Sequence, residues 1–206
     1  MFELVPLNAV PDAEVEALLD RAFGQDRHGR TAYMIRGDGI AIPTLSFAAV
    51  SGDVLLGSIQ CWPIALMTAN AALPLVMVGP VAVAPGHQGD GIGRALVARA
   101  LEVAAASDLG DALMLIGDPD YYGRFFGFSS ERTVAWQAPG PVERHRLLAL
   151  GGPYPTTLEC LARAQAQPAD DAAARLALRL PRDFTRGHAH PTSRSCLWTP
   201  SPILPR

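Results

Sequence analysis

Lysine is absent from this chain of 206 residues, so all 17 of its basic side chains are arginines. The absence excludes a lysine nucleophile or Schiff base. It also excludes the Walker phosphate loop, which needs Gly-Lys-Ser/Thr. The formal net charge is −3, whereas a nucleic-acid-binding domain carries a basic face. We therefore expect no nucleic-acid partner.

Cysteine is scarce. The three cysteines, Cys61, Cys160 and Cys196, stand far apart and form no Cys-x-x-Cys pair. This spacing predicts neither a disulfide framework nor a zinc site. We expect no bound metal.

Charge is missing from one long stretch, since Val54 to Gly86 contains no Asp, Glu, Lys or Arg. Prolines and glycines interrupt the stretch, so no apolar run approaches the ~20 residues that span a membrane. Adjacent buried strands account for it better. No basic segment precedes an apolar one at the N-terminus, so no secretory signal is predicted. We expect a cytoplasmic protein with no membrane partner.

The most informative feature is a strand, a glycine-rich turn and a helix in succession. The β-branched apolar run from Val76 to Val83, bounded by Gly and Pro, predicts a buried strand. After Arg94 a broad apolar stripe predicts a helix, formed by Leu96, Val97, Ala100, Leu101 and Ala104. Gly110 is placed to cap that helix in the left-handed conformation.

The turn between them suggests an anion site. Gly89, Gly91 and Gly93 remove side chains where the helix begins. Backbone N–H groups at a helix start lack intrahelical partners, and the helix dipole is positive there. A pyrophosphate could therefore be held by main chain alone. The dinucleotide fingerprint Gly-x-Gly-x-x-Gly does not fit this sequence. The alternative is a glycine turn that only lets the helix pack closely on the strand.

Two blocks, Val81 to Arg94 and Gly117 to Phe128, resemble the GNAT superfamily of acetyl-CoA-dependent N-acetyltransferases, specifically its YhbS-like branch. Weaker resemblance extends from about Leu4 to Leu150. The resemblance implies a mixed α/β fold. Its sheet is mostly antiparallel, has about seven strands, is splayed between the fourth and fifth, and is flanked by helices. Gly79-Pro80 lies inside the fourth strand, and because proline cannot donate to a ladder it predicts a bulge there.

The resemblance also implies a co-substrate and its binding residues. Acetyl-CoA would place its pantetheine along the backbone of Val81, Ala82 and Val83. Its pyrophosphate would lie on the turn and first helical residues, Gln88, Gly89, Asp90, Gly91, Ile92, Gly93 and Arg94. The acceptor would be a primary amine, on a small molecule or a peptide, covered by Gln25 to Gly39. The alternative for that segment is a solvated polar loop. A homodimer is left open.

Direct attack of the amine on the thioester in a ternary complex needs a polarised carbonyl and an acid for the leaving thiolate. Val81 N–H is the candidate for the carbonyl, because Pro80 has no N–H. The resemblance puts a tyrosine acid four residues before a Gly-Phe glycine, a position that Gly123 fills here. A one-residue insertion at Phe125-Phe126 gives Tyr122 that role, with Tyr121 as second choice. The alternative is that both tyrosines only cap the core.

The general base is less defined, because the fourth strand has no carboxylate. Asp118, at the end of the fifth strand, is the first candidate, and His28 the second. The alternative for Asp118 is a turn or capping residue before Pro119. The altered tyrosine spacing and the missing carboxylate favour a second hypothesis, a catalytically silent acyl-CoA-binding regulatory module.

The remaining elements are predicted from apolar patterns and turn residues. Strands are expected at residues 2–7, 45–50, 54–66, 75–83, 112–116, 128–137 and 144–150. Helices are expected from residue 11 to 23, within 25–39, and at 120–126. The transferase domain is expected to end at residue 150.

Residues 151–206 form a Pro/Arg-rich extension with eight of the eighteen prolines. There Thr156-x-x-Glu159 predicts a capping box and a helix to about Gln167. A second helix is expected at 170–180, and disorder from Pro181.

Overall fold

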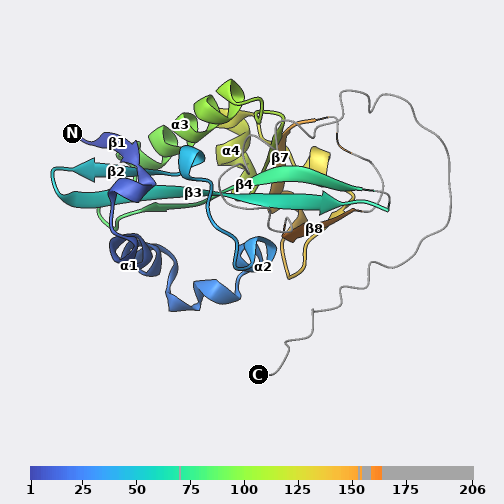
Figure 1. Ribbon diagram of the computed structural model, residues 1–206, viewed down its shortest axis with the longest axis horizontal. Coiled ribbons are helices and arrows are strands. Elements are labelled where there is room, and N and C mark those ends of the chain that lie inside the picture. The colour runs from blue at the N-terminus through green and yellow to red at the C-terminus, as the bar shows by residue number, and fades with distance from the viewer. Residues whose placement is uncertain (70, 153, 155–158, 164–206) are drawn as a thin grey trace.

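The computed structural model describes residues 1–69, 71–152, 154 and 159–163. One mixed sheet lies between two layers of helices, with α3 and α4 on one face and α1 and α2 on the other (Figure 1). The helices are α1 (Asp12–Phe23), α2 (Thr31–Arg36), α3 (Ile92–Ala106) and α4 (Pro119–Phe126). The strands are β1 (Glu3–Pro6), β2 (Phe47–Ser51), β3 (Val54–Met67), β4 (Ala72–Val83), β5 (Ala112–Ile116), β6 (Trp136–Gln137), β7 (Leu147–Gly151) and β8 (Glu159–Arg163).

The sheet runs in the order β1-β2-β3-β4-β5-β7, and β8 pairs with both β3 and β6. The β4–β5 and β6–β8 pairs are parallel, and the other pairs are antiparallel. Short 3₁₀ segments lie between these elements at η1 (Leu7–Ala9), η2 (Gln25–Gly29), η3 (Pro43–Leu45), η4 (Glu131–Thr133) and η5 (Arg144–Arg146). The predicted mixed, mostly antiparallel fold is confirmed.

The charge-free stretch forms the two long central strands. β3 and β4 pair from Gly57↔Val83 to Met67↔Ala72, and both of their faces are covered. On one face Ile59 and Cys61 join the core under α3, while on the other Trp62 and Ile64 join the core beneath Ile35 of α2. Burial on both faces explains why this stretch carries no charge.

Three sequence predictions are wrong in detail. The helix α3 ends in a left-handed residue, but this is Asp108 (φ +56°) rather than Gly110. A short polar residue such as Asp tolerates that conformation. The expected strand at 128–137 is reduced to β6 and one bridge, Ser129↔Ala149. Between them the chain turns through η4, where the buried Thr133 hydroxyl donates to the Leu147 carbonyl at 2.6 Å.

The third difference concerns the expected helix at 156–167. Its described part, Glu159–Arg163, is strand β8, which pairs with β3 from Ile64↔Arg163 to Met67↔Cys160. Pairing with an open strand edge outweighs the local capping-box signal, because helix propensity is a weak preference. The sheet thus continues past residue 150. The second helix expected at 170–180 and the disorder expected from Pro181 lie outside the described residues.

Among the described residues, no helix is both long enough and apolar enough to cross a membrane.

Candidate active site

β4 carries a bulge at its centre. Between Ile59 and Cys61 β3 advances two residues, while β4 advances three, from Val81 to Val78. Gly79 and Pro80 therefore both lie opposite Gln60. Gly79 has a φ of +119°, which a glycine adopts readily. The bulge predicted from Gly79-Pro80 is confirmed.

The sheet opens at this bulge. β4 pairs with β5 only at Val76↔Leu113 and Met77↔Met114, although β4 continues to Val83. The two parallel strands therefore separate toward their carboxyl ends, as predicted for the fourth and fifth strands. Among the described residues, no strand pairs with that edge of β4 from Val78 onward.

The alternation of an antiparallel ladder shows which backbone groups face the opening. Ala84 N–H donates to the Leu56 carbonyl at 2.8 Å, so Ala84 faces β3. Facing alternates along the strand, which turns Ala82 toward β3 as well. Val81 and Val83 consequently present their N–H and C=O groups to the opposite edge, where β5 has departed.

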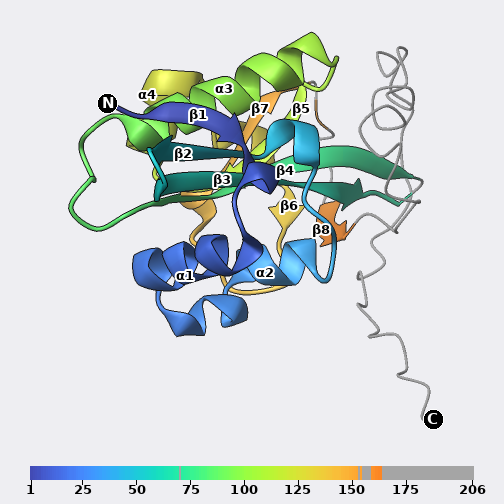
Figure 2. The ribbon, with the colours of Figure 1, turned by 60° about the vertical axis from the view of Figure 1, so that its left-hand side comes forward.

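The glycine turn leaves the start of α3 uncapped. Gly91 is the N-cap residue in the left-handed conformation (φ +81°), and no side chain caps the helix. A Cβ atom built on Gly89 or Gly91 would meet nothing within 4 Å, whereas one on Gly93 would lie 3.5 Å from the Val83 side chain. A Cβ on Gly93 would thus make only an ordinary contact, and Gly89 and Gly91, which both have positive φ, face open space. Figure 2 shows this green connection from β4 to α3 bending out beyond the helices.

Side chains beside the turn are already engaged with one another. His87 Nδ1 lies 3.1 Å from Asp90 Oδ2, which keeps that carboxylate paired when the histidine is protonated. The Arg94 guanidinium lies 4.8 Å from the centroid of the Phe125 ring. This contact joins the first turn of α3 to the last turn of α4.

Helix α4 follows directly on β5 and begins with a capped end. Asp118 is its N-cap, and Asp118 Oδ1 accepts a hydrogen bond from Asp120 N–H at 2.9 Å. The Tyr122 ring packs against Gly117, where any Cβ would overlap the ring. Burial, reinforced by Tyr121 and Asp118, raises the pKa of Tyr122 to about 12. Among the described residues the Tyr122 hydroxyl has no hydrogen-bond partner.

Tyr121 lies differently. Its ring meets the Tyr122 ring edge-on at 5.1 Å and the Phe125 ring at 5.2 Å. The two tyrosines therefore form part of one aromatic cluster, and of these two Tyr122 is the one packed against the core under α3.

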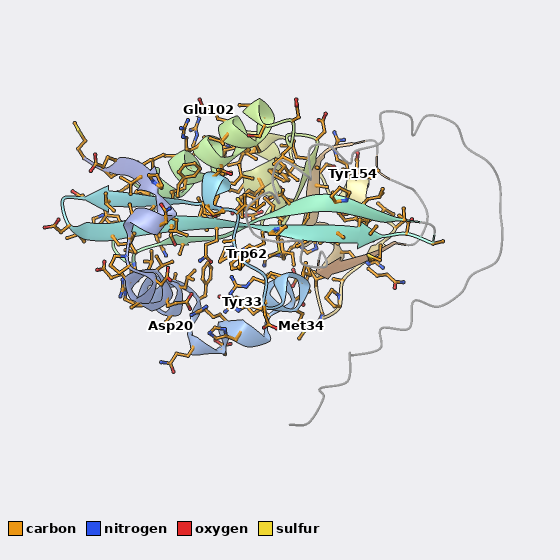
Figure 3. The ribbon with its side chains drawn as sticks, viewed as in Figure 1. Asp20, Tyr33, Met34, Trp62, Glu102 and Tyr154 are labelled. Atoms are coloured by element: carbon orange, nitrogen blue, oxygen red, sulfur yellow. The ribbon has the colours of Figure 1, made fainter. Side chains whose placement is uncertain are left out.

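The opposite face of the sheet holds a second polar group that the sequence did not single out. Arg27, buried to 2% exposure, donates from Nη2 to Glu16 at 2.5 Å and from Nε to Asp20 at 2.7 Å. It also donates to the Tyr33 hydroxyl. This network joins α1 and η2 to α2. In Figure 3 Asp20, Tyr33 and Trp62 lie on this side of the sheet.

Arg36, on α2, sits between this network and the sheet. Its guanidinium carbon lies 3.9 Å from the centroid of the Tyr33 ring and 4.0 Å from that of Trp62. Arg36 Nη1 donates to Gln60 Oε1 at a long 3.4 Å. Burial lowers the pKa of this guanidinium.

The segment between β6 and η5 borders the same face. The Thr31 hydroxyl donates to the Pro141 carbonyl at 2.5 Å, and Gly140 packs against Met34 of α2. A hollow of about 320 Å³ opens in this segment, lined by residues from Trp136 to Arg144. A second hollow, of about 570 Å³, lies beside His87 and Asp90.

The structure thus gathers the predicted turn, Val81 to Val83, and the start of α4 around one opening. His28 lies apart from that group, with its ring 5.0 Å from Tyr33. The sequence reading missed Gln60, Trp62 and the Arg27 network. Glu16 and Asp20, spaced i and i+4 on α1, were the available signal for a basic partner. Within the described residues, no group of His, Cys, Asp and Glu side chains could hold a metal ion.

Comparison with known proteins identifies the family. Residues 13–128 match the Acetyltransferase (GNAT) family. The chain belongs to this family. It is accordingly an N-acetyltransferase, and the predicted family is confirmed. No curated protein matches the chain.

Two solved GNAT structures share the fold. The GNAT family N-acetyltransferase YhbS from Escherichia coli, in complex with CoA, aligns with a TM-score of 0.53 at 23% identity, covering 84% of this chain and 83% of that one. A GNAT family acetyltransferase from Brucella melitensis, in complex with acetyl-CoA, aligns with a TM-score of 0.51 at 26% identity, covering 72% and 95%. Similar proteins therefore bind CoA or acetyl-CoA.

Proposed function

We propose that this GNAT domain transfers the acetyl group of acetyl-CoA to a primary amine by direct attack within a ternary complex. The observation that carries the proposal is the uncapped, glycine-lined start of α3 beside the open edge of β4. Unpaired N–H groups of Ile92, Gly93 and Arg94 suit a pyrophosphate. The complexes of the E. coli and B. melitensis proteins support this choice of co-substrate.

The open edge of β4 suits the rest of the co-substrate. Along this edge, the Val83 N–H group and the carbonyl groups of Val81 and Val83 can pair with an amide-containing arm as a neighbouring strand would. Ala82 lies between them with its own polar groups on β3. At the end of this arm the thioester carbonyl would accept a hydrogen bond from Val81 N–H, which follows the bulge.

The reaction then needs three movements of bonds and protons. The neutral amine nitrogen attacks the carbonyl carbon, and the C–S bond breaks. Tyr122 gives its hydroxyl proton to the departing thiolate, with Tyr121 as second choice. The proton lost from the amine passes to Asp118, directly or through water. The products are the N-acetyl amine and CoA.

The binding site is tested by a charge placed at the turn. Gly91→Glu would set a carboxylate against the pyrophosphate, while Gly91→Gln imposes the same backbone strain and bulk without charge. We expect calorimetry to show acetyl-CoA affinity at least about tenfold weaker for Gly91→Glu than for Gly91→Gln, because a like charge in a phosphate site costs more than 1 kcal/mol. Equal affinity in two folded variants would refute this site.

A folded chain that binds acetyl-CoA but releases no thiol with any amine would instead match the silent regulatory module. Thiol release from acetyl-CoA over a panel of amines separates these outcomes.

A further inference from the structure

Resting on the proposed function, we infer that the acceptor amine also carries a carboxylate, which Arg36 binds. On the proposed binding mode the phosphates lie at the start of α3, which leaves the opposite face of the sheet for the acceptor. That face is the one covered by α1 and α2. Arg36 lies there, beside the bulge that positions Val81.

The position of Arg36 follows from the ladder. Gln60 stands opposite Gly79 and Pro80, and Arg36 Nη1 reaches Gln60 Oε1. The side chains of Gln60 and Trp62 share one face of β3, because strand residues two apart point the same way. The guanidinium therefore lies over the point where β4 leaves β5.

The charge of Arg36 is not neutralised as that of Arg27 is. Arg27 holds two carboxylates, Glu16 and Asp20. Arg36 makes no ion pair among the described residues, and its hydrogen bond to Gln60 is to a neutral amide at 3.4 Å. Glu16 affects the pKa of Arg36 only by electrostatic attraction, without an ion pair. A partly buried arginine normally has a carboxylate or similar acceptor as its partner.

The two aromatic rings prepare this arginine for a planar anion. The guanidinium carbon lies over the Tyr33 and Trp62 rings, and the N–H groups that Tyr33 and Gln60 leave unused remain for a ligand. A guanidinium edge matches a carboxylate with two parallel hydrogen bonds. The contacts with the rings also hold the guanidinium in place, so it loses less conformational entropy on binding a ligand than an exposed arginine would.

Unused donors nearby strengthen the assignment. The indole N–H of Trp62 and the hydroxyl of Ser58 are buried and have no hydrogen-bond partner in the described part of the chain. Both belong to the same row of β3 as Gln60. Buried donors without partners are exceptions in folded proteins and mark places that a ligand or water completes.

The test compares each common amino acid with the amine that lacks only its carboxylate. Binding to the CoA-loaded protein is read by thermal shift, and turnover by thiol release from acetyl-CoA. We expect the carboxylate-bearing members to bind and react, and their decarboxylated counterparts to have kcat/KM values at least about tenfold lower. Preference for the uncharged amines, or no binding by any carboxylate-bearing member, would overturn the inference.

Arg36 is tested with a matched control. Arg36→Gln is expected to raise KM for the preferred carboxylate-bearing amine about tenfold or more, while leaving KM for uncharged amines unchanged. Arg36→Lys keeps the positive charge but cannot donate two parallel hydrogen bonds, so KM should rise by an intermediate amount. This variant keeps the test informative if Arg36→Gln folds poorly. Arg21→Gln removes the same charge from an exposed site on α1 and should change neither value. An equal effect of Arg36→Gln on both kinds of amine would show a structural role only.

Calorimetry with acetyl-CoA distinguishes the two proposals. A chain that does not bind acetyl-CoA fails the proposed function. A chain that binds it and acetylates amines without carboxylates fails only this inference.

Discussion

At the scale of single residues, Tyr122 and Tyr121 are adjacent but differently placed. Tyr122 packs against Gly117 and the core beneath α3, and Tyr121 faces Phe125. Adjacent helical residues point about 100° apart, so only one can address a given sulfur atom. The sequence could not decide between them, because the Phe125-Phe126 insertion leaves the spacing open.

Tyr122→Phe keeps the ring and removes only the hydroxyl. We expect kcat to fall at least about tenfold, with acetyl-CoA affinity nearly unchanged, because general acid catalysis contributes about 10²–10⁴-fold. Tyr121→Phe is the matched control and should retain turnover. If the two variants behave in the reverse way, the role belongs to Tyr121. If neither changes the rate, the proton comes from solvent.

The raised pKa of Tyr122, about 12, predicts how this acid depends on pH. An unperturbed phenol begins to ionise near about pH 10. Tyr122 should stay protonated to higher pH, so kcat should show no fall on the alkaline side due to this residue below about pH 10. A fall below about pH 10 that disappears in Tyr122→Phe would show that Tyr122 is the acid but that its pKa is not raised.

Asp118 serves α4 as a cap whether or not it is a base. Asp118→Asn keeps a good N-cap and removes the basic oxygen. If Asp118 accepts the amine proton, we expect kcat to fall by about 10²-fold or more with an unchanged melting temperature. Full turnover in the asparagine variant would leave Asp118 as a cap alone. His28→Gln, tested beside it, examines the second base candidate.

At the scale of elements, the sequence predicted the features that depend on neighbouring residues alone. The strand and helix on either side of the turn follow from a β-branched run and an apolar stripe, and the bulge follows from Gly79-Pro80, since proline cannot donate. Pairs that join distant segments were not predicted. Arg27 meets Glu16 and Asp20 across 11 and 7 residues, which no helical spacing rule covers.

Strand β8 also depends on a distant pairing that the sequence did not predict. The pattern Thr156-x-x-Glu159 is a genuine local helix signal, but an exposed edge of β3 competes for the segment. Edge pairing is visible only when the sheet is known. The contact of Arg36 with two aromatic rings could not be predicted from the sequence either, because Tyr33 lies on α2 and Trp62 on β3.

A prediction at this scale concerns β8. Chains ending at residue 163 and at residue 152 both lack residues 164–206, so their difference reports the β8 segment. We expect the shorter chain to melt about 5 °C lower or more, because several ladder hydrogen bonds at about 1 kcal/mol each are lost. Equal melting temperatures would support a domain that ends at residue 150, as the sequence analysis expected.

At the scale of the whole molecule, one sheet separates two kinds of recognition. On the proposed function, the face with α3 offers the backbone donors of one uncapped helix start, which suit phosphates. The face with α1 and α2 brings together side chains, Arg36 foremost, which suit a particular acceptor. The two faces are connected through the opening between β4 and β5.

The uncapped start of α3 has a consequence for the protein's own stability. Helix α4 has its first turn capped by Asp118, but no side chain in the described part of the sequence caps α3. On the proposed binding mode, the phosphates supply this cap. The native state then gains RT ln(1 + [L]/Kd), about 2.7 kcal/mol at a hundredfold excess over Kd. Starvation for acetyl-CoA and free CoA together would lower the folded fraction of the enzyme as well as its rate, so its abundance would follow the CoA supply.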